Sequence, residues 1–165
     1  MTQNTPLPEH PAHIEVLRKE LKHSIVVIES AHPIENYTCA VHAFHLIDDP
    51  TYLRIADFGL GKTFAGSEFI AFLLEHQLLV PRDGCSIIRD DLIIYLDNGS
   101  FKHVGRIHSP ARMLSKWGKG YFYEHGVWEV PSNYGEEMRF FSGPDECESF
   151  ELFIEYAKSK GFSFR

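Results

Sequence analysis

Apolar positions recur at helical spacing near the start of the chain. Ile14, Leu17 and Leu21 share one side of the helix that this spacing predicts, and we expect that side to cover the core. Residues 1–12, before the helix, carry prolines among polar residues, a composition that is typical of loose connecting segments. We therefore expect residues 1–12 to form a flexible N-terminal arm.

A short helix is predicted to begin at or beside Cys39. Thr38 is a residue of the kind that caps helices, and it follows a break at His32-Pro33. The backbone N–H groups at a helix N-terminus stabilise a thiolate, so this position favours a reactive cysteine. After residues 51–69, whose pattern is mixed, a further helix is predicted to end at Val80-Pro81, with one face made by Phe69, Phe72, Leu73 and His76.

The middle of the chain alternates like strands. Residues 90–96 and 101–107 are rich in apolar residues and flank Asn98-Gly99, the strongest short signal for a tight hairpin turn. Residues 111–118 and 136–141 predict two more strands. Residues 145–161 then predict an amphipathic closing helix that Gly161 terminates.

These elements predict an α+β fold, with N-terminal helices packed on an antiparallel β-meander and a C-terminal helix. On the second strand of the hairpin, alternation puts Phe101, His103 and Gly105 on one face, where the glycine would leave room beside the imidazole. A histidine held on a strand opposite a helix-bound cysteine is the arrangement of a thiol site. Cys39 and His103 are therefore the candidate catalytic pair.

The paired strands carry a resemblance to a known family. The segments RDDLIIYL and KHVGRI resemble the signature of NlpC/P60-like cysteine hydrolases, in which a Gly-Asp-Leu-apolar strand precedes a His-Val-Gly strand. The resemblance covers roughly residues 36 to 118, and the later SKWG, EHG and VP..YG segments are similar to those of uncharacterised bacterial relatives. Asp90 stands where the family has glycine, and Thr38 stands where it commonly has Asp or Asn.

This resemblance implies a papain-like domain over residues 13–165, with Cys39 as nucleophile and His103 as general base. The third, orienting residue would be Ser115, on the strand after the histidine, and His125 is the competing candidate. Tyr37 is a candidate to direct its hydroxyl toward the oxyanion beside the Cys39 N–H.

The expected activity is hydrolysis of an amide or related acyl bond, as in an amidase, peptidase or thiol protease. It requires no metal and no organic cofactor, and its substrate would be peptide-like or acyl. The alternative is a papain-like binding or immunity module without catalysis, which would grip a protein partner.

Composition limits the other possibilities. The 165 residues, 44% hydrophobic, suit one domain, and a net charge of −7 disfavours nucleic acid as a partner. No signal peptide or membrane span is evident, so we expect a cytoplasmic protein that binds no membrane. Three cysteines, an odd number, indicate reduced thiols. We expect Cys85 and Cys147 to be small buried apolar residues.

Three further patterns suggest other interpretations. The segment ADFGLGKT ends like a phosphate-binding loop, but Ala56 stands where that loop requires glycine. His42, His45 and Asp48 are spaced three apart, which is a weak indication of a metal site. An aromatic stretch forms either ordinary core or the lining of a substrate groove, and it comprises Tyr121, Phe122, Tyr123 and Trp128.

Overall fold

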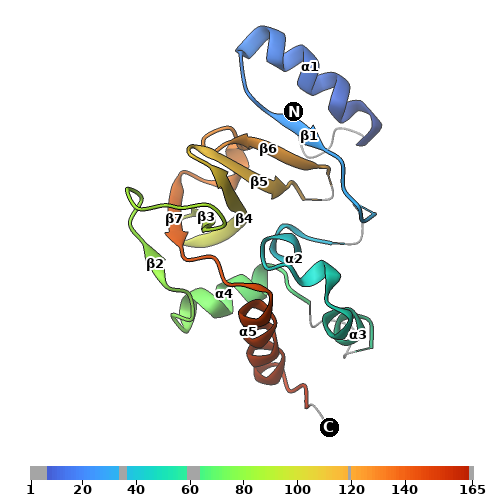
Figure 1. Cartoon of the computed structure of the whole chain (residues 1–165), viewed down its shortest axis with the longest axis vertical. Coiled ribbons are helices and arrows are strands. Elements are labelled where there is room, and N and C mark those ends of the chain that lie inside the picture. The colour runs from blue at the N-terminus through green and yellow to red at the C-terminus, as the bar shows by residue number, and fades with distance from the viewer. Residues whose placement is uncertain (1–6, 34–36, 59–63, 119, 164–165) are drawn as a thin grey trace.

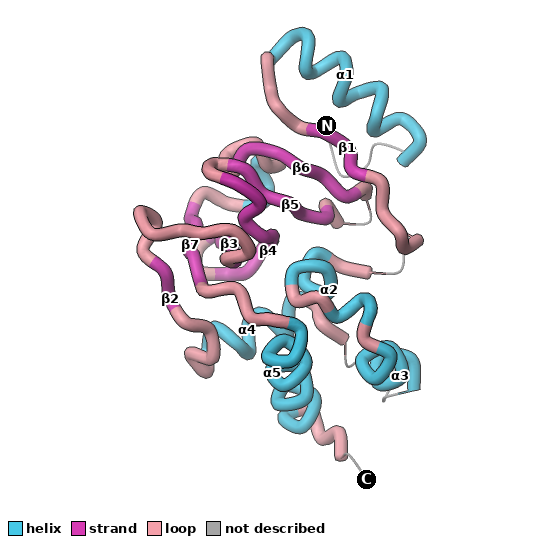
Figure 2. Tube along the Cα trace, in the orientation of Figure 1, coloured by secondary structure: helices cyan, strands magenta, loops and turns pink. Residues whose placement is uncertain are grey.

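The computed structural model describes residues 7–33, 37–58, 64–118 and 120–163. Within these ranges the chain folds into five α-helices and one antiparallel sheet of seven strands, which confirms the predicted α+β class. Figures 1 and 2 show the sheet between α1 on one side and the group α2 to α5 on the other. The helices are α1 (His10–Leu21), α2 (Cys39–Ala43), α3 (Pro50–Phe58), α4 (Ser67–Glu75) and α5 (Glu146–Ser159). Three short 3-10 helices are η1 (Leu7–Glu9), η3 (Leu46–Asp48) and η4 (Ser132–Tyr134).

The sheet has the order β1-β6-β5-β4-β3-β7-β2. Its strands are β1 (Val26–Ile28), β2 (Pro81–Arg82), β3 (Leu92–Asp97), β4 (Ser100–Ser109), β5 (Arg112–Lys116), β6 (Phe122–Gly126) and β7 (Glu137–Phe141). Strands β3 to β6 form a meander in sequence order, whereas β7 returns to pair with β3 on its other side.

The predicted hairpin is confirmed. Asn98 and Gly99 have φ angles of +50° and +74°, the left-handed values that a two-residue turn of this kind requires. The predicted closing helix is also confirmed, since Asp145 and Glu148 form a reciprocal capping box at the start of α5. Gly161 follows the helix with a φ angle of +87°.

The inner strand β3 is apolar at successive positions because both faces of the sheet are covered. Its alternate residues enter two separate cores. The helix-side core joins α2, α3, α4 and α5 to one face, through residues that include Leu92, Ile94, Leu96 and Val104. The opposite core takes Ile14 from α1 together with Ile93, Tyr95, Ile107, Met113, Trp117, Tyr123 and Tyr134.

Several predicted boundaries are wrong. Of the arm expected at residues 1–12, residues 7–12 form η1 and the first turn of α1, because His10 is buried and bonds Tyr123 Oη at 3.0 Å. Residues 1–6 lie outside the described residues. The helix expected to reach Val80 ends at Glu75, and His76 is its exposed C-cap.

Three strands were not predicted. β1 and β2 have only three and two residues, too few for alternation to be visible in the sequence. β6 lies within the aromatic stretch, and each of its faces mixes aromatic with polar side chains, Phe122 with Glu124 on one and Tyr123 with His125 on the other, so no alternation is visible. The strand at residues 136–141, expected fourth in a meander, is β7 beside β3.

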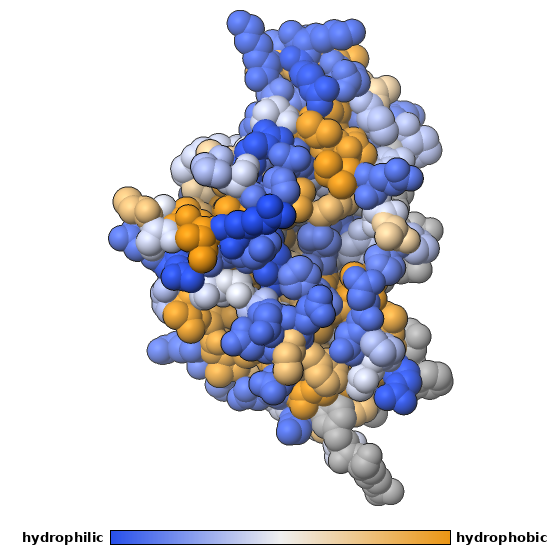
Figure 3. All heavy atoms as spheres, in the orientation of Figure 1, coloured by the Kyte–Doolittle hydropathy of each residue, from blue (hydrophilic) through white to orange (hydrophobic). Residues whose placement is uncertain are grey.

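The described surface mixes hydrophilic and apolar side chains, as the face in Figure 3 shows. Leu21 and Val80 are among the large apolar residues that are exposed. No helix in the described part of the chain has the length and apolar character needed to cross a lipid bilayer.

Candidate functional site

Cys39 is the first residue of α2, as its capping residue predicts. Thr38 is the N-cap, and its hydroxyl accepts a bond from the Val41 N–H at 3.2 Å and donates one to the Ala65 carbonyl at 2.7 Å. The hydroxyl therefore both starts the helix and anchors it to the segment before α4. The thiol position is fixed by tertiary contact as well as by local capping.

The Cys39 sulfur lies against backbone N–H groups of its own helix and of β4. Burial raises the pKa of the Cys39 thiol, and this effect outweighs hydrogen bonds from the N–H groups of Val104 and Ala40 and the charge of Lys116, which act in the opposite direction. Val104 is the residue after His103. The thiol is therefore protonated at neutral pH, although donors suited to a thiolate surround it.

His103 lies on the face of β4 opposite to the face that carries the side chain of Val104. Its ring stacks on Tyr134, with centroids 4.2 Å apart and planes at 17°, and lies 5.9 Å from the ring of Tyr95. The residue is 1% exposed, and its Nε2 has no hydrogen-bond partner among the described residues. Burial, aided by the charges of His125 and His42, lowers the pKa of His103 well below 6.5, so the imidazole is neutral at neutral pH.

The structure thus brings Cys39 to the residue beside His103, but among the described residues no hydrogen bond joins the thiol to the imidazole.

The prediction that Phe101, His103 and Gly105 share one face of the strand is wrong for Phe101. A bulge at Lys102 shifts the β3–β4 register, so Phe101 packs into the helix-side core while His103 faces the other core. The space expected beside Gly105 is filled, since an added Cβ would lie 2.3 Å from Met113 Cε and 2.8 Å from Ser115 Cβ.

The two candidates for the third position, Ser115 and His125, are bonded to each other. Ser115 Oγ lies 2.7 Å from His125 Nε2, and the Trp117 indole N–H donates to Ser115 Oγ at 3.0 Å. His125 Nδ1 lies 2.8 Å from the Gly126 carbonyl, to which it must donate, so Nε2 is the acceptor. Burial lowers the pKa of His125 to about 4. Among the described residues neither side chain bonds His103, so an orienting role for either stays a prediction.

Sequence reasoning missed Lys116 as a site residue. Its side chain is fully buried, and Nζ donates to the carbonyls of Gly118 at 2.7 Å and Gly120 at 3.1 Å. Nζ also lies 5.0 Å from the ring centroid of Tyr37. The sequence could have indicated this position, because alternation along residues 112–116 puts Lys116 on the face opposite to Ser115. In the structure this face is the one that α2 covers.

Tyr37 is buried rather than exposed, and its hydroxyl is 2.7 Å from Ser30 Oγ. With His42 and Phe122 it lines a pocket of about 220 Å³ beside the start of α2. The aromatic stretch is therefore divided, since Phe122 lines this pocket, Tyr123 is core and Trp128 is 76% exposed. An oxyanion role for Tyr37 stays a prediction.

Tyr134 is a second residue that sequence reasoning did not assign to the site. It stacks on His103, and burial together with the nearby Cys39 raises the pKa of its hydroxyl. Tyr134 and Gly135 are the last two residues of the VP..YG segment. Gly135 has a φ of +90°, and a Cβ there would lie 2.1 Å from the Leu96 carbonyl oxygen, so only glycine lets Tyr134 reach the imidazole.

The Asp90-Asp91 pair has a structural role. Asp90 has a φ of +70°, a left-handed conformation that glycine favours. Asp91 is buried, and its carboxylate accepts from the Ile88 N–H at 2.9 Å and from Arg82 Nε at 3.3 Å.

The alternative chemical patterns do not assemble. The candidate metal ligands His42, His45 and Asp48 are not on one helix, because α2 ends at Ala43 and His45 has a φ of +52°. No group of three metal-binding side chains occurs among the described residues. Ala56 lies inside α3, and residues 59–63 of the phosphate-loop pattern lie outside the described residues.

Cys85 and Cys147 are exposed, so their prediction as buried apolar residues is wrong. All three cysteines are free thiols.

Comparison with protein-family models, with curated proteins and with solved structures finds no match for this chain.

Proposed function

We propose that this chain is a thiol hydrolase of papain-like type that cleaves amide or related acyl bonds through Cys39, with His103 as general base. One observation carries the proposal: the sulfur of Cys39, at a capped helix start, lies against the N–H of the residue that follows His103. The unpaired Nε2 of His103 supports it, because a buried ring nitrogen without a partner has a proton-accepting site to offer.

In the proposed reaction the pair starts neutral. As the sulfur attacks the carbonyl carbon and the C–S bond forms, His103 Nε2 takes the thiol proton. The oxyanion is stabilised by the backbone N–H groups of Cys39 and Ala40, which lie beside the sulfur at the start of α2. The C–N or C–O bond then breaks, His103 returns the proton to the leaving group, and water hydrolyses the thioester. In the free chain the sulfur packs with the helix-side core and the imidazole faces the opposite core, so the reaction requires a rearrangement of β4 that brings the ring to the sulfur.

The directions of the pKa shifts support a neutral pair rather than a preformed thiolate–imidazolium pair. Burial raises the pKa of Cys39 and lowers that of His103, so the proton stays on sulfur before attack. Lys116 and the surrounding N–H groups favour the charge that develops during the reaction.

A second candidate function is a binding module that retains the fold without catalysis. It is favoured by the stacking of His103 on Tyr134 and by the closed network of Ser115, Trp117 and His125, which leaves His103 without an orienting partner among the described residues.

The two functions are distinguished by acylation of Cys39. In a Cys85→Ser/Cys147→Ser variant, Cys39 is the remaining thiol, and the two replaced residues are exposed, so the fold should tolerate their loss. With p-nitrophenyl acetate, a hydrolase gives a stoichiometric burst followed by turnover. Adding Cys39→Ser should abolish the burst, and His103→Gln should slow acylation about a hundredfold or more.

Mass spectrometry of the quenched reaction locates the acetyl group. If His103→Gln acylates at the same rate as its parent, His103 is no base and the hydrolase proposal fails. If Cys39 acquires no acetyl group while an unfolded control does, the binding module is the correct interpretation.

A further inference from the structure

Strand β7 has an open edge. Its outer neighbour β2 pairs only with Phe140 and Phe141, because the chain turns away at Asp83, whose carboxylate and carbonyl accept the N–H groups of Cys85 and Ser86. In the part of the chain that the structure describes, residues 137–139 have β3 on one side and no strand on the other.

The backbone of Met138 faces this open edge. The Ser142 N–H donates to the Val80 carbonyl at 2.8 Å, toward β2. Because N–H and C=O groups of alternate residues point to the same side of an antiparallel strand, Phe140 and Met138 present theirs in the same direction. Phe140 is paired with Arg82, so Met138 has the next donor and acceptor available to a new strand.

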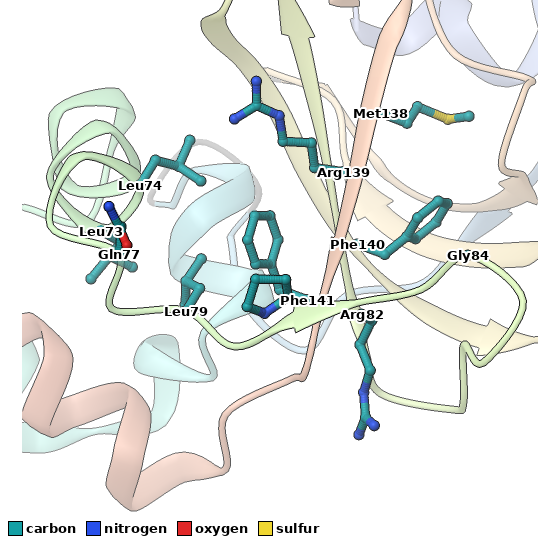
Figure 4. A pocket seen from close by; sticks show the side chains of 11 residues that line it. Leu73, Leu74, Gln77, Leu79, Arg82, Gly84, Met138, Arg139, Phe140 and Phe141 are labelled. Carbon is teal, nitrogen blue, oxygen red and sulfur yellow. The ribbon is translucent and has the colours of Figure 1, made fainter.

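A cavity of about 660 Å³ lies along this edge and extends to both faces of β7. In Figure 4, Arg139 and Phe141 point toward α4, whereas Met138 and Phe140 point to the opposite side. A compact ligand would fill one side. An extended peptide places alternate side chains on both sides of the strand it joins, and this shape fits the cavity.

The charge of the cavity is opposite to that of the chain. Among the described residues, the charged residues that line it are Arg82 and Arg139, although the net charge of the chain is −7. Arg82 pairs with the buried Asp91, and its side chain points away from the other lining residues in Figure 4. Arg139 donates to Glu137 through Nη2 at 2.6 Å and through Nε at 2.7 Å. Both side chains are half-exposed, so water competes with this pair, and the guanidinium has further N–H donors for another carboxylate.

We propose that the open edge of β7 binds an extended acidic peptide segment of another protein. The segment pairs with the main chain of Met138, directs a carboxylate to Arg139, and packs an apolar side chain against Phe140 beside Gly84. The proposal does not depend on the hydrolase function. A second copy of the chain fits less well. Only residues 137–139 of β7 are open, and a β7 strand from another copy that continued past them would run into β2, which lies beside Phe140 and Phe141.

The test selects short random peptides, displayed on phage, against the full chain, and then measures the affinity of the enriched peptides by fluorescence polarisation. We expect an acidic residue at a fixed position between apolar residues. Arg139→Gln should weaken binding about tenfold, whereas Arg89→Gln, at another exposed arginine, should leave binding unchanged.

Two variants test the edge itself. Met138→Pro removes the outward N–H and should abolish binding. Since that variant can also fail to fold, Gly84→Leu provides independent evidence: a Cβ at Gly84 meets Phe140 only at 3.6 Å, so the leucine fits and fills the cavity, and binding should be lost.

The absence of any enriched peptide, or affinities unaffected by Gly84→Leu and Arg139→Gln, would overturn the proposal. Sedimentation that finds a dimer, dissociated by Gly84→Leu, would also overturn it, since the occupant would then be a second copy.

Discussion

At the scale of single residues, burial decides the charge state of the candidate pair. Cys39 has the helix start and the N–H donors that stabilise a thiolate, yet the cost of desolvating an anion is larger and keeps the proton on sulfur. His103 is neutral for the same reason, since its ring lies between aromatic residues. Residue types alone would have predicted a charged pair.

Lys116 is the residue whose removal should change Cys39 most directly. Lys116→Met deletes the nearby positive charge that lowers the pKa of Cys39, so the pKa of the thiol should rise further. The measurement is the pH midpoint of iodoacetamide alkylation in the Cys85→Ser/Cys147→Ser background. Lys102→Met, at an exposed position that pairs with Asp97, is the control and should not move the midpoint. An unchanged midpoint in Lys116→Met would contradict the assigned role.

At the scale of elements, close packing of β4 against β5 explains the glycine in the His-Val-Gly segment of β4. Gly105 lies where β4 approaches β5, and a Cβ there would be 2.7 Å from the Leu114 carbonyl oxygen, a backbone atom that cannot move aside. The glycine therefore lets Ser115 and Met113 pack under β4. Arg106, the next residue, connects three elements by donating to the carbonyls of Ala43, Asp90 and Pro144.

Gly105→Ala should lower the free energy of unfolding by about 3 kcal/mol, at the upper end of the range for overpacking. Gly99→Ala is the matched control: its φ of +74° is unfavourable for alanine, but no atom lies within 4 Å, so the loss should be about 1 kcal/mol. Urea denaturation measures both. Equal losses would show that the contact between β4 and β5 is not the constraint.

At the scale of the whole molecule, three histidines link folding to pH: the partly buried His42 and the buried His103 and His125. Burial lowers the pKa of His42 and His125 to about 4 and that of His103 well below its usual 6.5. Below about pH 6.5 the unfolded chain binds protons at these sites that the folded chain does not. The free energy of unfolding should therefore fall as the pH is lowered from about 6.5 toward 4.

Each histidine contributes up to about 1.4 kcal/mol per pH unit in this range. Urea denaturation at several pH values measures the slope. His103→Phe preserves the aromatic stack on Tyr134 and removes one of the three sites, so its slope should be smaller by about one proton. A slope equal to that of the unmodified chain would mean that His103 is not held neutral by the fold.

Local patterns predicted the elements that depend on neighbouring residues. The turn at Asn98-Gly99, the cap at Thr38 and the end of α5 at Gly161 were predictable because the required backbone angles or capping bonds involve residues close in sequence. β1, β2 and β6 were not predicted, because they exist only through pairing with distant strands.

The sequence by itself determined the α+β class, the hairpin that carries His103 and the helix start that carries Cys39. Only the tertiary structure decided that a bulge turns His103 away from Phe101, that Ser115 bonds His125, and that Lys116 and Tyr134 lie beside the site. Capping and turn preferences act over a few residues and are therefore readable from the chain. Burial and the proton affinities that follow from it depend on which distant segments exclude water from a side chain, and only packing sets them.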